Sequence, residues 1–166
     1  MALWLLEQAV SWARLWRTIP GERVTVSVPL VAQTLHDCAA LEAIMRTVRD
    51  SGLPPGTLDL LIDEATLLGG ESDLSAALRA SGATLTLTDF GARTISLHQL
   101  SRLVPDRLKI HRVFVREVGA DPDRMAMARS LIALAQTLNI STIADGISSD
   151  SDAQFFKWEG CDLGQG

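Results

Sequence analysis

Short apolar runs alternate along the whole chain with longer segments whose apolar residues recur at helical spacing. Residues 3–18 predict a helix, because Leu5, Ala9, Trp12 and Trp16 recur at that spacing between polar residues. By the same argument, helices are predicted at about 37–50, 72–81, 96–103, 121–138 and 151–158. Strands are predicted at about 24–28, 58–62, 83–88, 108–110 and 140–144, with a last one near Cys161.

This repeated alternation of strand and helix predicts a parallel α/β fold. Periodicity alone does not separate an open doubly wound sheet from a closed barrel, so both architectures stay open at this point. The chain has 166 residues and shows neither a low-complexity linker nor a close internal repeat. A chain of this length forms one domain with a real core, and we expect a single domain over residues 1–166.

Composition narrows the functional classes. With 47% hydrophobic residues, 21% charged residues and a net charge of −5, the chain is typical of a folded globular protein. It contains no run of Lys and Arg, so we expect no nucleic-acid partner. The apolar start is interrupted by Glu7 and never reaches the ~18 apolar residues of a membrane span. We therefore expect a cytoplasmic protein without membrane contact.

Three tryptophans and two cysteines need their own interpretation. Trp4, Trp12 and Trp16 are expected to pack the first helix onto the sheet, with an interface between chains as the alternative. Cys38 and Cys161 lie far apart and belong to no metal-binding motif, so we expect two reduced, buried thiols.

Polar side chains follow several predicted strands and, in a parallel sheet, would face one rim. They include Asp63, Glu64, Thr88, Asp89, Lys109, His111, Asp145 and Gln165. Glu64, Asp89 and Asp145 offer oxygens suited to Mg²⁺ or Mn²⁺, and Lys109 could hold a phosphate. The alternative is purely structural, because carboxylates at strand ends often cap the next helix, and a histidine there is more often just hydrogen-bonded.

Six segments carry a resemblance to one family. They are residues Val26–Val31, Leu58–Glu64, Thr88–Gly91, Leu108–Val115, Ala144–Ser148 and Gly160–Gly166. In this order they resemble the motifs of the EAL domain family, the cyclic di-GMP phosphodiesterases of bacteria. The resemblance implies a TIM-like β/α barrel that binds cyclic di-GMP over its rim. It also implies two Mg²⁺ or Mn²⁺ ions that activate a water to open one phosphodiester bond.

The departures from the family pattern are as informative as the matches. Positions with metal-binding or acidic residues in the family carry Pro29, Leu61, Thr88, His111 and Ser148 here, and Asp145 is shorter than the family's glutamate. Glu64, Asp89, Lys109 and Gln165 match the family. The strand with the Glu-Ala-Leu motif has no counterpart, so we expect an incomplete barrel, either open or completed by a partner.

These departures predict a non-catalytic, EAL-like regulatory module that acts through protein–protein interaction, with a protein partner or a homodimer. Residual nucleotide binding would use Arg93, Lys109 and Gln165. No catalytic residues, metal or cofactor are expected, and Asp89 and Asp145 are the weak metal candidates. The alternative is an active Mg²⁺- or Mn²⁺-dependent phosphodiesterase with a rearranged site that uses His111 and Asp145. A third hypothesis is that the chain is a fragment of a longer protein.

Overall fold

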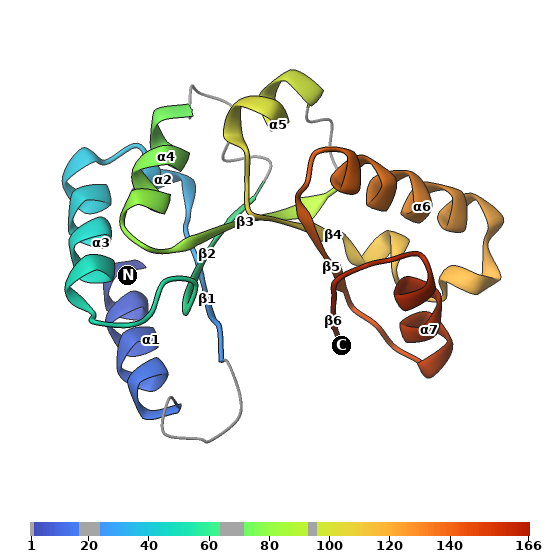
Figure 1. Cartoon of the computed structure of the whole chain (residues 1–166), viewed down its shortest axis with the longest axis horizontal. Coiled ribbons are helices and arrows are strands. Elements are labelled where there is room, and N and C mark those ends of the chain that lie inside the picture. Colours follow the sequence, from blue (N-terminus) through green and yellow to red (C-terminus); the bar gives the residue numbers. More distant parts are fainter. Residues whose placement is uncertain (1, 17–23, 64–71, 93–95) are drawn as a thin grey trace. The chain divides into compact units, whose positions relative to one another are not determined.

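The computed structural model of the chain describes residues 2–16, 24–63, 72–92 and 96–166 (Figure 1). Backbone contacts group the chain into two compact units, Met1–Thr86 and Leu87–Gly166. No helix among the described residues combines the length and apolarity that a bilayer crossing requires. The predicted single domain over residues 1–166 stays a prediction.

Six strands form one sheet in the order in which they occur along the chain. They are β1 (Val26–Pro29), β2 (Leu58–Asp63), β3 (Thr84–Phe90), β4 (Arg107–Ile110), β5 (Ser141–Asp145) and β6 (Leu163–Gln165). Strands β1 and β2, β4 and β5, and β5 and β6 pair in parallel. This order never reverses, which is the strand order of a β/α barrel and differs from a doubly wound sheet with its switch point. The predicted parallel α/β class is confirmed.

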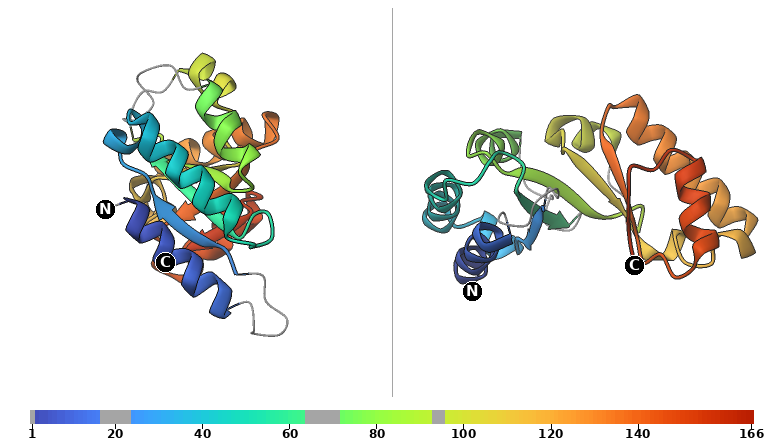
Figure 2. Two further views of the ribbon diagram at one scale, coloured as in Figure 1. Left: turned by 90° about the vertical axis from the view of Figure 1, so that its left-hand side faces the viewer. Right: turned by 60° about the horizontal axis from the view of Figure 1, so that its bottom comes forward.

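The first unit places α1 (Ala2–Trp16) beside α3 (Cys38–Asp50), on one side of β1 and β2 (Figures 1 and 2). A short helix that the sequence did not predict, α2 (Ala32–Leu35), precedes α3, and α4 (Ser72–Ala80) follows β2. The Asp37 side chain accepts hydrogen bonds from the backbone N–H groups of Ala39 and Ala40 and so begins α3. The buried side chains of this unit include Leu6, Ile44, Leu58, Leu60 and Leu85.

The expected orientation of α1 is wrong. Trp4 and Trp12 keep 59% and 51% of their surface exposed, and Trp16 is exposed as well. The helix instead buries a neighbouring stripe made of Leu6, Ala9, Val10 and Ala13. Both stripes satisfy helical spacing, but the small alanines let α1 approach α3 and β1 closely, which the indole rings would prevent.

The second unit contains α5 (Leu97–Leu103), α6 (Pro122–Thr137) and α7 (Asp150–Trp158), with two 3₁₀ turns, η2 (Arg112–Phe114) and η3 (Val118–Ala120). Asp121 caps α6 and proline occupies its first turn. Helices α6 and α7 lie on one side of β5 and β6 (Figures 1 and 2). The buried side chains here include Leu108, Ile110, Ile132, Ala144 and Phe156.

Register decides which residues of the second unit share a face. Leu108 pairs with Thr142 and Ile110 with Ala144, and all four are buried. Because side chains alternate along a strand, Lys109 and Asp145 emerge on the opposite face. That second face carries the polar residues and therefore the candidate site.

The cysteines correct a further expectation. Both thiols are free, but Cys38 is exposed and Cys161 is only half-buried. Cys38 is the first residue of α3, where the following turn leaves its side chain at the surface. Burial raises the pKa of the Cys161 thiol above its ordinary value, although its hydrogen bonds with Thr142 and Leu163 oppose this shift.

Candidate functional site

The ends of β4, β5 and β6 bring three predicted site residues onto one face. Asp145 is the register partner of Gln165, so these two side chains emerge on the same side of the sheet. Lys109 Nζ lies 3.3 Å from Asp145 Oδ1 across the neighbouring strands. The backbone N–H groups of Gly146 and Ile147 donate to the Gln165 carbonyl at 2.7 and 2.9 Å, which holds the two strand ends together.

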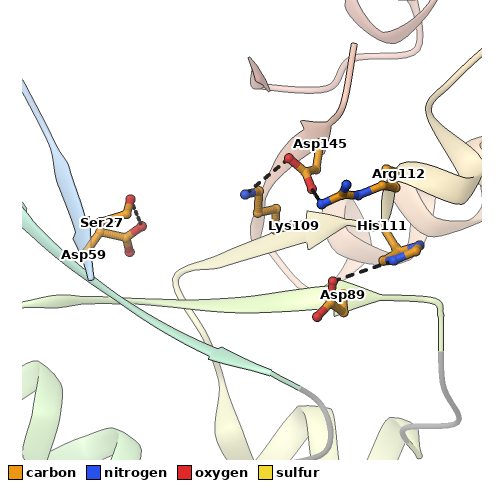
Figure 3. Close-up of polar contacts among 7 residues, drawn as sticks. All are labelled: Ser27, Asp59, Asp89, Lys109, His111, Arg112 and Asp145. Atoms are coloured by element: carbon orange, nitrogen blue, oxygen red, sulfur yellow. Dashed lines mark hydrogen bonds and ion pairs between the residues drawn. The ribbon is translucent and has the colours of Figure 1, made fainter. Parts of the chain in front are cut away.

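A second cation approaches the same carboxylate. Arg112, in the turn that follows β4, places Nη2 4.0 Å from Asp145 Oδ2 (Figure 3). The side chains of Lys109 and Asp145 are 16% and 19% exposed, whereas that of Arg112 is 59% exposed. Each oxygen of Asp145 therefore faces a cation, and the lysine pair is the better shielded from water.

Asp89 and His111 form a separate contact on this unit. His111 Nδ1 accepts a hydrogen bond from the Val113 backbone N–H at 3.2 Å, which leaves the ring proton on Nε2. Nε2 lies 3.8 Å from Asp89 Oδ1 (Figure 3). Asp89 has a φ of 59°, a left-handed conformation that aspartate tolerates better than most residues. Its carbonyl accepts from Ala92 N–H at 3.0 Å, so Asp89 belongs to the turn that ends β3.

The loop after Asp145 is shaped around a glycine. Gly146 has a φ of 87°, and a Cβ atom there would lie 3.0 Å from Arg112 Cβ and 3.5 Å from Arg116 Nε. The two arginines, four residues apart, thus both pack against Gly146. A larger residue at this position would strain the backbone and displace both arginines, of which Arg112 faces Asp145.

Ser148 stands where the family motif has a second glutamate, and the structure turns it toward α7. Its hydroxyl donates to Asp152 Oδ2 at 2.9 Å, and Asp152 is buried. Burial alone would raise the pKa of Asp152, but hydrogen bonds from Ser148 and Ser149 hold that pKa below its ordinary value. The pair therefore fixes the loop to the helix.

The first unit holds a buried polar cluster that the sequence did not single out. Asp59 Oδ1 accepts from Thr84 Oγ1 at 3.0 Å and from Thr86 Oγ1 at 2.7 Å. Its Oδ2 accepts from Ser27 Oγ at 3.0 Å (Figure 3). The sequence did contain a signal for this cluster, because Asp59 stands among the leucines of β2. A buried carboxylate needs hydrogen-bond partners.

The remaining predicted positions divide into two groups. Pro29 and Leu61 are register partners on β1 and β2, so two positions that carry ligands in the family lie side by side without a ligand atom. Glu64 and Arg93 lie outside the described residues. Arg112 and Arg116 were missed as site residues, although arginines directly after the lysine strand were a readable signal.

The resemblance implies a pair of Mg²⁺ or Mn²⁺ ions at the strand ends. No group of three His, Cys, Asp or Glu side chains within the described ranges is arranged to hold a metal ion. Asp145 faces Lys109 and Arg112, which would have to move before a cation could approach. The donor set in the described part of the chain does not fit a two-metal centre.

Two cyclic di-GMP phosphodiesterases align with almost the whole chain. Cyclic di-GMP phosphodiesterase NbdA of Pseudomonas aeruginosa is 30% identical over 98% of this chain and 21% of its own length. Cyclic di-GMP phosphodiesterase PdeR of Escherichia coli is 30% identical over 98% of this chain and 25% of its own length. The chain thus spans only about a quarter of these curated relatives.

The fold of the chain also matches solved structures. A c-di-GMP complex of the PaMucR phosphodiesterase matches with a TM-score of 0.86 and 28% identity, over 97% of this chain and 67% of that one. The EAL domain of Mycobacterium smegmatis DcpA matches with a TM-score of 0.87 and 27% identity, over 96% of this chain and 73% of that one. The expected incomplete barrel of the EAL type is confirmed. The EAL domain model matches residues 1–166, and the chain belongs to the EAL domain family.

Proposed function

We propose that this chain is a non-catalytic regulatory module in bacterial cyclic di-GMP signalling and that it acts through protein contact. The names of its relatives support the signalling system, because NbdA and PdeR are cyclic di-GMP phosphodiesterases and the PaMucR structure is a c-di-GMP complex. The main support for the proposed loss of catalysis is the ion pair of Lys109 with Asp145.

The charge balance at Asp145 opposes a divalent cation. A pair of divalent ions needs several anionic oxygens to hold it and to offset its charge. Asp145 already faces the Lys109 ammonium and the Arg112 guanidinium. An ion that entered here would meet repulsion from both groups, and the family's other ligand positions include Pro29 and Leu61, which supply no oxygen side chain.

The exposed face of α1 supports the protein contact. Trp4, Trp12, Leu15 and Trp16 are exposed on this helix, and the rings of Trp12 and Trp16 lie 5.8 Å apart. Tryptophan is enriched in the buried centres of protein interfaces. The patch carries no charge of its own, so it fits an equally apolar surface, and a second copy of the chain presents one by symmetry.

Two assays on the intact chain test the catalytic half of the proposal. Hydrolysis of cyclic di-GMP with Mg²⁺ or Mn²⁺ should be absent, and calorimetric titration with Mn²⁺ alone should show no tight binding. The proposal would be contradicted if Mn²⁺ supports hydrolysis of cyclic di-GMP to a linear dinucleotide and if Asp89→Ala or Lys109→Ala abolishes that hydrolysis. This result would establish the active phosphodiesterase. Metal-dependent hydrolysis thus distinguishes the active phosphodiesterase from the non-catalytic module.

The proposed protein contact through α1 needs a separate measurement. Sedimentation velocity over a hundredfold range of concentration should show self-association that Trp4→Gln/Trp12→Gln weakens. Met127→Gln on α6, another exposed apolar position, is the matched control and should leave the association unchanged. A monomer at all concentrations would contradict the homodimer.

A further inference from the structure

We infer that a second copy of the chain docks on α1 with its own α1, the two helices running antiparallel about a two-fold axis. This inference rests on the proposed contact between chains, and it names the surface and the orientation of that contact. The contact uses one stripe that runs along α1 on the side turned away from the core. The members of this stripe are all exposed, and they are Trp4, Leu5, Gln8, Trp12, Leu15 and Trp16.

The two charged residues of α1 lie outside the stripe. Arg14 donates from Nε and Nη2 to the Ser51 carbonyl, directly after α3, at 3.1 and 2.7 Å. Glu7 lies two turns before Arg14, and both residues line a hollow between α1 and α3. The side of α1 that faces α3 is therefore polar, whereas the stripe carries no charge. An uncharged surface can be covered by a second one without the cost of desolvating a charge.

The stripe is large enough for a stable pair. Trp4, Trp12 and Trp16 keep 59%, 51% and 38% of their surface exposed. With roughly 250 Å² for each tryptophan, these rings leave about 370 Å² per chain, and Leu5 and Leu15 add about half as much. A symmetric contact that covers both stripes buries about 1,100 Å², which exceeds the roughly 1,000 Å² expected of a specific interface.

The order of residues in the stripe selects an antiparallel pair. With the two-fold axis beside position 10, every member of the stripe lies level with a member of the partner's stripe. A shift by one turn in either direction would leave Trp4 or Trp16 beyond the end of the partner helix. The antiparallel orientation also brings opposite ends of the two helix dipoles together. The resulting pairs are Trp4 with the partner's Trp16, Leu5 with the partner's Leu15, and Gln8 with the partner's Trp12.

A lipid surface is the other kind of ligand that an exposed tryptophan helix can meet. Helices that lie on a membrane carry several Lys or Arg residues beside their apolar face. Arg14 is the one basic residue of α1, and its guanidinium is bound to the Ser51 carbonyl. The net charge of the chain is −5, which opposes binding to an anionic bilayer. The stripe therefore fits a second copy of the chain better than a membrane.

Disulfide trapping in the intact chain tests the orientation. Leu5→Cys and Leu15→Cys are made separately in a Cys38→Ser/Cys161→Ser background and are oxidised alone and as a mixture. The mixture should give at least about tenfold more linked dimer than either variant alone. Equal positions of the two helices lie about 15 Å apart in this arrangement, and a disulfide joins Cα atoms less than about 7 Å apart. Met127→Cys on α6, mixed with Leu5→Cys, is the matched control and should give no linked dimer.

Sedimentation equilibrium tests the predicted pair of tryptophans. Trp4→Gln and Trp16→Gln should each raise the dissociation constant of the dimer at least about tenfold, because each removes a ring from the centre of an interface. Trp4→Gln/Trp16→Gln should raise it by less than the product of the two single effects, since both substitutions remove the same contact. Independent effects of the two substitutions would contradict the pairing.

Each remaining outcome decides the inference. Linked dimer in the mixture alone supports the antiparallel pair, and linked dimer in each single variant shows a parallel pair and overturns it. A dimer in sedimentation without any link at these positions overturns the inference and leaves the proposed contact between chains standing. A monomer at all concentrations, or a monomer that sediments with phosphatidylcholine vesicles, overturns both. Hydrolysis of cyclic di-GMP with Mn²⁺ beside the expected links overturns the proposed loss of catalysis and supports the helix pair alone.

Discussion

Lys109 and Asp145 lie on neighbouring parallel strands, with Nζ 3.3 Å from Oδ1 and less than a fifth of either side chain exposed. The carboxylate is one of the weak metal candidates suggested by the sequence, yet its partner in the structure is an internal cation. Partial burial makes this pair stronger than a surface salt bridge, and it also makes each charge costly without the other.

Asp145→Leu should lower the free energy of unfolding by about 1–3 kcal/mol, because Lys109 then keeps a largely buried charge without its carboxylate. Lys109→Met/Asp145→Leu removes both charges and should recover part of that loss. Urea unfolding of the two single variants and the double variant gives the coupling energy. Purely additive losses would show that the two side chains do not interact.

Thr86→Val should destabilise the first unit by about 1–3 kcal/mol, because Asp59 loses a short hydrogen bond, 2.7 Å, inside the core. Thr25→Val is the matched control, since Thr25 is exposed and its hydroxyl donates over 3.3 Å. Its effect should stay within about 0.5 kcal/mol. Equal effects in urea unfolding would mean that the Asp59 cluster does not stabilise the fold.

Asp152 should make stability depend on pH in the acid range. Its pKa is lowered in the folded state, so its contribution is present above the ordinary pKa of aspartate and is lost as pH falls through the lowered value. Asp152→Asn should cost about 1–3 kcal/mol at pH 7, and its difference from the wild type should narrow below about pH 4.

Urea unfolding as a function of pH measures this difference, with Asp150→Asn as control. Asp150 lies in the same first turn of α7 but is exposed, and its replacement should cost less than about 1 kcal/mol. A difference for Asp152→Asn that stays constant from pH 7 to pH 3 would show that the Ser148 and Ser149 hydrogen bonds do not favour the charged form.

The two thiols should react at different rates. Cys38 is exposed, whereas burial raises the pKa of the Cys161 thiol and shields it. Iodoacetamide at pH 8 should therefore modify Cys38 first and Cys161 at least about tenfold more slowly, as mass spectrometry over time can record. Cys38→Ser should leave only the slow phase, and a single fast phase in that variant would rule out the described environment of Cys161.

The two stripes of α1 should differ sharply in their effect on stability. Leu6→Ala should cost about 2–5 kcal/mol, because Leu6 is completely buried in the first unit. Trp4→Ala should cost less than about 1 kcal/mol, because Trp4 is exposed on the other stripe. Thermal or urea unfolding compares them, and a larger loss for Trp4→Ala would restore the orientation expected from the sequence.

The sequence by itself determined the alternation of strands and helices, most element positions and the family. These features follow from local periodicity, from helix caps such as Asp121 with Pro122, and from motif residues that lie close together in the sequence. It also showed that Pro29 and Leu61 carry no ligand atom, since that depends only on residue type. The register of β1 with β2 was needed to place these two positions side by side.

Only the tertiary structure decided which partners the polar residues find. Helical spacing allowed two apolar stripes on α1, and close packing against α3 selected the one with Leu6 and Ala9. Lys109 and Asp145 are separated by more than thirty residues, and the parallel register of β4 with β5 makes them an ion pair. Arg112 joins them because the turn after β4 folds over Gly146. Contacts of this kind depend on packing between distant segments, which no local pattern encodes.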